Sequence, residues 1–458
     1  MKKSLCTIIL ISTFFTVCTN AANVTFKVDM RKAKTPANSV ISMRGNLDPL
    51  SWKKSNIVLT DVDKDGIFTA TVSFDSKADN KLAYKYLINE KWEDVSNRKI
   101  NLTETQTTND VFGEEIYRTA PYFFEKDDKV IDFAARMTSE QTVHGVSQII
   151  MHNDKVDTLM TWGFRDVEGK LSVDANTLFH IGGMGQSITA FAVLRAVEQK
   201  RLDLDKPLNT YLISMKIEGD FTVRDLLMGV IKLNGETKPD GYAKGQTIPT
   251  LQDIFNGKNS NTPKMKQGSG KSEKPVFNIF SGLLAQQMLE DIYKKSFTEI
   301  IQMEVLTPLN MKNTFIKAEL SDIETQNASV GYDKSGKAVA GKRLIFPELG
   351  FGGVWTTATD YAKFITYLMK AYRGEDNTLL SKDMAKAALD PTNQFRALIF
   401  PQGDNGNYFG GAATGFRTQV SFNAADNWLL VSFMNSYENW RTMLDVEKAG
   451  KQFLKSKM

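Results

Sequence analysis

Hydrophobic and polar positions alternate in several short runs of the first hundred residues. The alternation is clear at 24–28 and 67–74, and the run at 82–88 is rich in aromatic and branched residues. Such runs with a period of two are typical of half-buried strands, and turn-forming residues separate them. Several strands at this spacing predict a small, all-β sandwich over residues 23–113.

From residue 129 onward the pattern changes to a mixture of periods. Apolar positions at helical spacing predict helices at 187–200, 283–294 and 360–372. Alternating runs joined by turn signals predict hairpins at 148–162 and 419–434. This combination predicts an α+β fold in which helices pack on an antiparallel sheet.

Three further segments complete the predicted domain organisation. Residues 1–22 carry Lys2 and Lys3 before a short apolar run and a small residue, which is the pattern of a signal peptide. Residues 114–128 are charged and aromatic and are interpreted as a linker before a domain at 129–458. The stretch 256–274, rich in Lys, Gly, Asn and Ser, is interpreted as a loop.

The predicted signal peptide has consequences for the localisation of the protein and for its cysteine chemistry. A cleaved signal predicts a secreted or periplasmic protein, and an uncleaved membrane anchor is the alternative. The two cysteines, Cys6 and Cys18, both lie in the leader, so the mature chain has neither a disulfide nor a thiol nucleophile. No other segment is long and apolar enough to cross a membrane.

Composition argues against metals, cofactors and nucleic acid as partners. The chain has three histidines and no cysteine after the leader, so we expect no metal site of either ligand type and no cofactor. Removal of the leader takes away Lys2 and Lys3 and no acidic residue, and the remaining 55 basic and 53 acidic residues give no reason to expect nucleic acid or acidic lipid.

An acidic turn offers one alternative to that expectation. Asp61, Asp63, Asp65 and Gly66 have the spacing that begins a calcium-binding loop. The twelfth position, where such a loop needs a bidentate glutamate, is Val72. Because this ligand is missing, a hairpin turn is favoured over a calcium-binding loop.

One segment of the larger domain carries a family resemblance. The run 177–190, Thr-Leu-Phe-His-Ile-Gly-Gly-Met-Gly-Gln-Ser-Ile-Thr-Ala, resembles the active-site segment of the serine β-lactamase and penicillin-binding-protein superfamily. The likeness is greatest to class C β-lactamases and related esterases. Flanking segments at 202–208, 223–227, 308–314 and 352–357 fit the same pattern, and the resemblance spans about 130 to 455.

The resemblance implies a serine and a lysine three residues apart, followed by two further motifs. In this chain the serine position is Gly183 and the lysine position is Gln186, which provide neither a nucleophile nor a titrating base. The second motif, tyrosine–serine–asparagine, falls on Phe277 to Ile279. The basic residue of the third falls on Phe409. We therefore predict that the catalytic positions are degenerate at Gly183, Gln186, Phe277, Ile279 and Phe409.

Two nearby side chains are candidates for replacing the lost groups. Ser187 lies one residue beyond the lysine position and has no lysine three residues on. His180 lies in a predicted strand, where a structural role is favoured. The glycines at the helix start could alternatively leave N–H groups that hold a carboxylate or another small ligand.

The first domain resembles the starch-binding modules of glucan-active enzymes, which have immunoglobulin-like sandwich folds. Trp52, Lys85, Trp92 and Asn97 follow the order and spacing of that family. The resemblance implies an aromatic platform of two tryptophans, with Lys85 and Asn97 hydrogen-bonding an α-glucan or another glycan. The alternative is that both tryptophans belong to the core.

These expectations favour an exported pseudo-hydrolase that acts by binding a glycan, a peptide or a partner protein. A weak esterase or peptidase that uses non-standard residues is the alternative. A third possibility is a role in envelope assembly, with the larger domain as an interaction surface.

Overall fold

The computed structural model describes most of the chain. It covers residues 21–112, 143–391, 397–436 and 440–455, except 32, 34, 37, 76–80, 94–96, 103–104, 235–239, 277 and 404. The predicted signal peptide, up to residue 20, and the predicted linker lie outside the described residues. The chain divides into two compact units, residues 1–118 and 119–458, which are described separately.

The described residues of unit 1 form two sheets. In the first, β1 (Ala21–Asp29) pairs antiparallel with β4 (Ile67–Asp75) and parallel with β8 (Thr105–Val111). The second has the order β3-β2-β5-β6, and β7 also pairs with β5. Its strands are β2 (Ile41–Gly45), β3 (Ile57–Leu59), β5 (Lys81–Ile88), β6 (Lys91–Trp92) and β7 (Arg98–Asn101).

One apolar core contains side chains from both sheets of unit 1. Phe26 of β1 packs edge-to-face against Tyr84 of β5, with ring centroids 4.9 Å apart. A buried ionic group lies beside this core, where Arg98 pairs with Glu93 at 2.6 Å and with Asp110 at 3.3 Å. The alternating pattern of the sequence is therefore realised as strands with one inward face.

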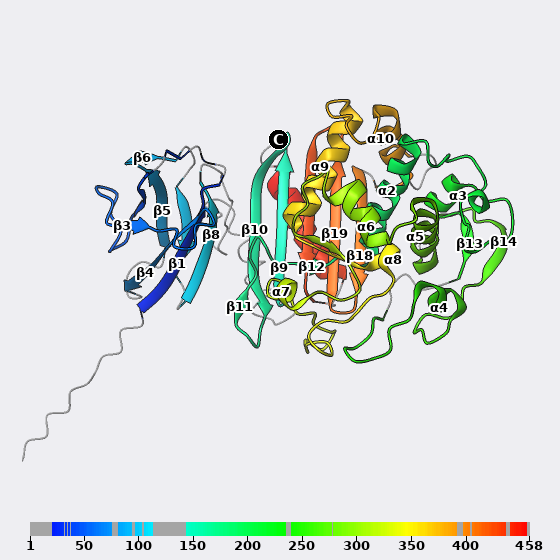
Figure 1. Ribbon diagram of the computed structural model, residues 1–458, viewed down its shortest axis with the longest axis horizontal. Coiled ribbons are helices and arrows are strands. Elements are labelled where there is room, and N and C mark those ends of the chain that lie inside the picture. The colour runs from blue at the N-terminus through cyan, green and yellow to red at the C-terminus, as the bar shows by residue number, and fades with distance from the viewer. Residues whose placement is uncertain are drawn as a thin grey trace, which may run out of the picture. The chain divides into compact units, whose positions relative to one another are not determined.

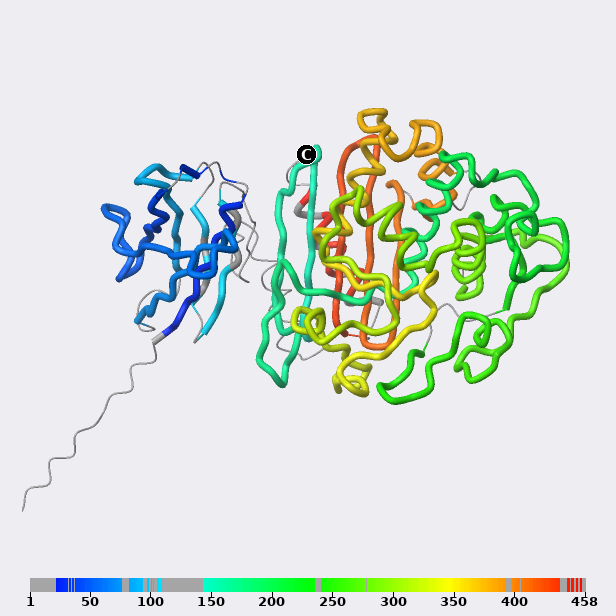
Figure 2. Tube along the Cα trace, in the orientation of Figure 1, coloured from blue at the N-terminus to red at the C-terminus, as the bar shows by residue number. Residues whose placement is uncertain are grey.

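Unit 2 is built on a seven-stranded sheet of order β11-β10-β9-β20-β19-β18-β17. All of its strand pairs are antiparallel, and β9 pairs with β20, which comes from the far end of the chain, so that His152 lies opposite Trp428 and Val146 opposite Met434 (Figure 2). The strands are β9 (Gly145–His152), β10 (Lys155–Asp166), β11 (Leu171–Ser172), β17 (Gln402–Gly403), β18 (Gly406–Ala413), β19 (Phe416–Asn423) and β20 (Trp428–Met434).

Helices cover this sheet on both faces (Figure 1). On β9, Ile149 belongs to the large core shared with α2 (Gln186–Glu198) and α9 (Ala358–Arg373), whereas Ile150 packs in the smaller core with α11 (Trp440–Lys455). The remaining helices are α3 (Val223–Leu227), α4 (Leu251–Asn256), α5 (Ile279–Tyr293), α6 (Phe297–Ile301), α7 (Asp322–Thr325), α8 (Leu349–Gly352) and α10 (Lys382–Leu389). This architecture confirms the predicted α+β fold with an antiparallel sheet.

Smaller elements complete the unit. A three-stranded sheet has the order β12-β16-β15, and a ribbon joins β13 to β14. Their bounds are β12 (Phe179–His180), β13 (Ile231–Leu233), β14 (Gln267–Lys271), β15 (Thr314–Ile316) and β16 (Val354–Thr356), with single helical turns at Gly182–Gly185 (η1), Leu208–Thr210 (η2) and Gln302–Leu306 (η3).

One expectation about this unit is wrong. The predicted loop at 256–274 contains β14, which pairs antiparallel with β13 so that Ile231 lies opposite Lys271. The partner strand supplies the buried side chains, Ile231 and Leu233, while β14 itself is mostly exposed and shows no apolar alternation. The strand is therefore defined by its pairing and could not be recognised from its own composition.

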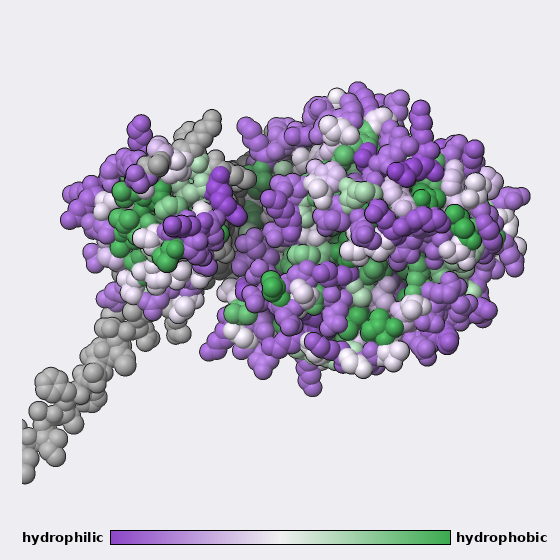
Figure 3. All heavy atoms as spheres, in the orientation of Figure 1, coloured by the Kyte–Doolittle hydropathy of each residue, from purple (hydrophilic) through white to green (hydrophobic). Residues whose placement is uncertain are grey.

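No helix among the described residues is long and apolar enough to cross a membrane. The face of the molecule visible in Figure 3 is mainly hydrophilic, with scattered hydrophobic side chains.

Candidate functional sites

Gly183 lies in the single turn η1, directly before α2, at the position where the family resemblance expects a serine. The preceding Gly182 has φ +54°, and a Cβ there would lie 2.3 Å from the Ala412 carbonyl oxygen, so that position requires glycine. Gly183 has no such backbone constraint. A Cβ on Gly183 would instead meet the ring of Phe351 at 3.1 Å, a contact that a small shift of the ring would relieve. The fold therefore does not by itself explain why Gly183 is a glycine.

The ring beside Gly183 belongs to Phe351, which the sequence did not single out. Phe351 lies in the short helix α8 and is 2% exposed. Phe277 lies outside the described residues, and Phe409 lies on β18, on the wall of a neighbouring pocket.

Gln186, at the lysine position, has a hydrogen bond to the backbone of another helix. Its amide Nε2 donates to the carbonyl oxygen of Asn278 at 3.2 Å, and the residue is 8% exposed. Asn278 caps α5 by accepting from the Ser281 N–H, and its own amide donates to the Leu233 carbonyl oxygen at 3.0 Å. A neutral amide at position 186 thus ties α2 to the start of α5.

Ile279 begins α5 and is 1% exposed. Its side chain belongs to the main apolar core and does not line the pocket described next. The structure therefore brings Gly183, Gln186 and Phe409 to one region of unit 2, whereas Ile279 is buried in the main apolar core.

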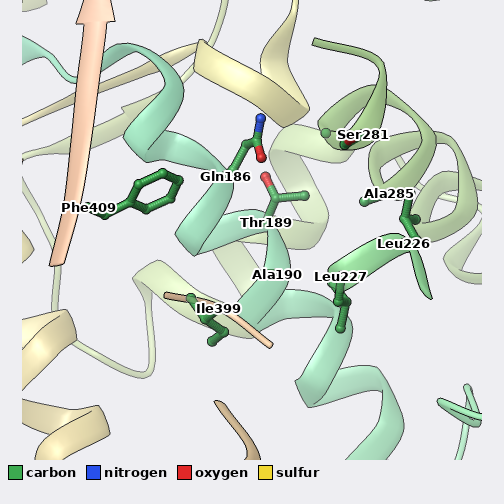
Figure 4. Close-up of a pocket in the computed structure, with 10 residues that line it drawn as sticks. Gln186, Thr189, Ala190, Leu226, Leu227, Ser281, Ala285, Ile399 and Phe409 are labelled. Carbon is green, nitrogen blue, oxygen red and sulfur yellow. The ribbon is translucent and has the colours of Figure 1, made fainter. Parts of the chain in front are cut away.

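A small pocket lies beside Gln186 (Figure 4). Figure 4 shows Phe409 projecting from β18 toward α2, which carries Gln186, Thr189 and Ala190. The other lining residues are Leu226, Leu227, Ser281, Gly282, Ala285 and Ile399. The space open to the centre of a water molecule is about 20 Å³, enough for about one water and far below the ~300–1,000 Å³ of ordinary ligand sites.

The two candidate replacements, Ser187 and His180, are both packed away from solvent. Ser187 is fully buried, and its hydroxyl donates to the Met184 carbonyl oxygen at 2.7 Å and contacts the Tyr361 hydroxyl at 2.9 Å. Burial lowers the pKa of His180 to about 3, so its ring is neutral at physiological pH. The His180 ring lies 4.3 Å from that of Phe346, and its Nδ1 accepts the Gly182 N–H at 3.3 Å. Both side chains are held by packing and hydrogen bonds, although Nε2 of His180 has no hydrogen-bond partner among the described residues.

Glu348 is a titratable group that no sequence pattern singled out. It is 1% exposed and directly precedes α8, the helix that carries Phe351. Burial raises its pKa to about 7, against weaker opposing hydrogen bonds from its own backbone and from the Thr262 hydroxyl. Its second carboxylate oxygen has no hydrogen-bond partner among the described residues. Glu348 therefore lies close to half-protonated at neutral pH.

The tryptophans of unit 1 form an accessible pair. The rings of Trp52 and Trp92 have centroids 6.0 Å apart at an angle of 49°, and Trp92 is 42% exposed. Lys85 Nζ lies 5.9 Å from the Trp92 ring, and Asn97 is exposed just before β7. The tryptophans are therefore not core residues, which was the alternative to a platform.

A residue that the sequence missed completes this face of unit 1. The guanidinium of Arg44 lies 5.2 Å from the centre of the Trp92 ring, within the range of a cation–π contact. Arg44 is distant from Trp92 in sequence, and only the pairing of β2 with β5 brings it to the site.

The acidic turn needs no ion to explain its spacing. Ligand atoms of Asp61, Asp63 and Asp65 lie within 4.8 Å of one another. The Asp61 carboxylate, however, accepts hydrogen bonds from the backbone N–H groups of Asp65 at 3.2 Å and Gly66 at 3.0 Å. The aspartates thus form the turn that leads into β4.

Comparison with known proteins gives the family of unit 2. The family described as Beta-lactamase matches residues 130–445. The teichoic acid D-alanine hydrolase of Staphylococcus aureus is 21% identical over 289 residues, and the match covers 62% of this chain but only 64% of that relative. Among solved structures, FmtA from Staphylococcus aureus superposes with a TM-score of 0.56 at 18% identity, covering 73% of this chain and 93% of FmtA. A class C β-lactamase superposes with a TM-score of 0.57 at 15% identity, covering 71% and 97%. At these identities the solved structures show the fold alone, and it is the family match over more than two thirds of the chain that shows this protein to be a member of the β-lactamase family.

Proposed function

We propose that this protein is an exported, non-catalytic member of the β-lactamase family that acts by binding. The observation that carries the proposal is the pair of residues at the expected serine and lysine positions. Gly183 has no side chain, and Gln186 uses its amide to hold Asn278. Acyl-serine hydrolysis needs a nucleophile and a base within hydrogen-bond reach, and loss of the nucleophile alone costs about 10⁶-fold in turnover.

The surroundings of Gly183 support the same proposal. Phe351 covers the position, and the pocket beside Gln186 is walled by the apolar side chains of Phe409, Ile399 and Leu226. A group bound against Gly183 would have to displace the Phe351 ring. Both features favour a retained scaffold over a working active site.

Restoring the missing groups tests this account. We would compare the wild type, Gly183→Ser with Gln186→Lys, and the same pair with Phe351→Leu, using a fluorescent penicillin and a fluorophosphonate. The wild type should stay unlabelled, and labelling should appear in the triple variant, where the added serine no longer meets the phenylalanine ring. Labelling of the wild type at a pocket residue would contradict the proposal.

A weak esterase or peptidase is the second candidate, and one observation favours it. The Ser281 hydroxyl lines the pocket close to Gln186, and a relative of this chain is a teichoic acid D-alanine hydrolase. If the wild type were labelled, loss of the label in Ser281→Ala would assign activity to that residue. Loss of the label in Ser187→Ala instead would point to the buried hydroxyl of α2.

For unit 1 we propose an immunoglobulin-like, starch-binding-like module that binds a saccharide on Trp52 and Trp92. The exposed ring of Trp92 and the half-buried ring of Trp52 offer flat apolar area to a sugar face, and Lys85 and Asn97 can donate to its hydroxyls. Mobility in gels containing amylose or glycogen should be retarded for the wild type and normal for Trp52→Ala and Trp92→Ala. Equal mobility of all three proteins would remove the idea.

A further inference from the structure

Two cations lie against the exposed ring of Trp92. Arg44 and Lys85 approach its centre to 5.2 Å and 5.9 Å. They come from neighbouring strands, β2 and β5, and are directly opposite each other in the antiparallel register. The aromatic pair is therefore flanked by two positive groups.

These two charges are only partly compensated. Arg44 forms an ion pair with Glu90, and its Nε donates to the Ser55 hydroxyl at 3.1 Å. Lys85 has no carboxylate partner among the described residues of the chain. Like charges directly opposite each other on adjacent strands destabilise a sheet, so one carboxylate for two cations leaves an unfavourable positive excess at the ring.

The local sequence increases this excess. The segments 44–55 and 85–92, which carry both tryptophans, hold five basic residues against two acidic ones. The basic residues are Arg44, Lys53, Lys54, Lys85 and Lys91, and the acidic ones are Asp48 and Glu90. A neutral glucan has no negative group that could pair with this positive charge.

We propose that the Trp52–Trp92 site takes an acidic saccharide, whose carboxylate or phosphate group lies between Arg44 and Lys85 while its sugar ring packs on the tryptophans. This rests on the proposed function, that unit 1 binds saccharides on the aromatic pair. A guanidinium matches the two oxygens of a carboxylate or phosphate, and an ammonium adds a second charge-assisted hydrogen bond. The Glu90 side chain is 61% exposed, so a ligand anion can replace it on Arg44 at little cost.

The two sources of the negative charge are distinguished by using one polymer. Amylose, amylose oxidised at C6 to the carboxylate, and amylose phosphate share a backbone and differ only in charge. Affinity of the full-length protein for each would be measured by titration calorimetry at low and at physiological salt. At least one charged polymer should bind about tenfold more tightly than amylose, the gain of one charge-assisted hydrogen bond, and salt should reduce the gain.

Variants then assign that gain to named side chains. In Arg44→Gln and in Lys85→Gln the ratio of charged to neutral affinity should fall toward one. Lys64→Gln, which removes a lysine from the acidic turn of the same unit, should leave the ratio unchanged, and Trp52→Ala should weaken binding of every polymer. Circular dichroism and unfolding midpoints would confirm that each variant is folded.

The outcomes separate the two proposals. Equal affinity for charged and neutral amylose, or an unchanged ratio in both the Arg44 and Lys85 variants, overturns the acidic-saccharide proposal and leaves saccharide binding in place. Absence of binding to all three polymers overturns both.

Discussion

Replacing Glu348 by glutamine should stabilise unit 2 at alkaline pH and not at acid pH. The carboxyl is buried, and its pKa is raised from 4.5 to about 7. Between these values the unfolded chain is ionised while the folded chain keeps the proton, so stability falls as pH rises from 4.5 to about 7 and is constant above that.

The size of the effect follows from the shift. A difference of about 2.5 pH units at about 1.4 kcal/mol per unit corresponds to about 3 kcal/mol. Glutamine cannot ionise, so Glu348→Gln removes this dependence. Between pH 4 and pH 8 the difference in free energy of unfolding between the variant and the wild type should therefore change by about 3 kcal/mol in favour of the variant. A constant cost of burying the glutamine amide does not alter this change.

Urea unfolding of both proteins at several pH values measures this difference. Glu324→Gln provides a control of opposite sign: burial alone would raise the Glu324 pKa, but hydrogen bonds from Lys317 and Ser321 hold it below its usual value. That control should lose more stability at neutral pH than at acid pH, because its stabilising hydrogen bonds need the ionised carboxylate. A Glu348→Gln effect that is the same at pH 4 and pH 8 would refute the burial argument.

Three other predictions concern packing and burial. Gly183→Ala should change the free energy of unfolding by less than about 1 kcal/mol, because a small shift of the Phe351 ring relieves the contact, whereas Gly182→Ala, at φ +54° and with the Ala412 carbonyl oxygen 2.3 Å away, should cost more than about 1 kcal/mol. Arg98→Met leaves Glu93 and Asp110 buried without their cation and should lower the stability of unit 1 by about 3–5 kcal/mol in thermal unfolding. The His180 ring should stay neutral in NMR titrations until the protein unfolds. Because its pKa is lowered to about 3, its contribution to stability should be lost as pH falls from 6.5 toward 3, and His180→Gln should flatten that decline.

Periodicity predicted the elements whose own side chains determine their burial. The alternation at 67–74 became β4 (Ile67–Asp75), and the helix expected at 360–372 became α9 (Ala358–Arg373). In both cases one face of the element packs on a core and the other faces water, so its own sequence shows the corresponding periodicity of apolar and polar residues. The strand β14 was not predicted because its own side chains are mostly exposed and only its pairing with β13 defines it.

The candidate sites divide in the same way. Gly183 and Gln186 could be selected from the sequence because they lie in one continuous motif at a helix start. Phe351 and Arg44 could not, because each reaches its site through tertiary contacts: α8 packs on η1, and β2 pairs with β5. Glu348 was missed since nothing in the sequence indicates that a glutamate will be buried without a cation.

The most direct test of the account is the intact mass of the wild-type protein after prolonged exposure to a penicillin and, separately, a fluorophosphonate. A working acyl-serine site would form a covalent adduct with at least one of them. We predict that the mass of the folded protein is unchanged, while a class C β-lactamase treated in parallel gains one equivalent. A stoichiometric adduct on the wild-type chain, mapped by peptide analysis to a residue of the pocket beside Gln186, would contradict the claim that this domain has no acyl-serine chemistry.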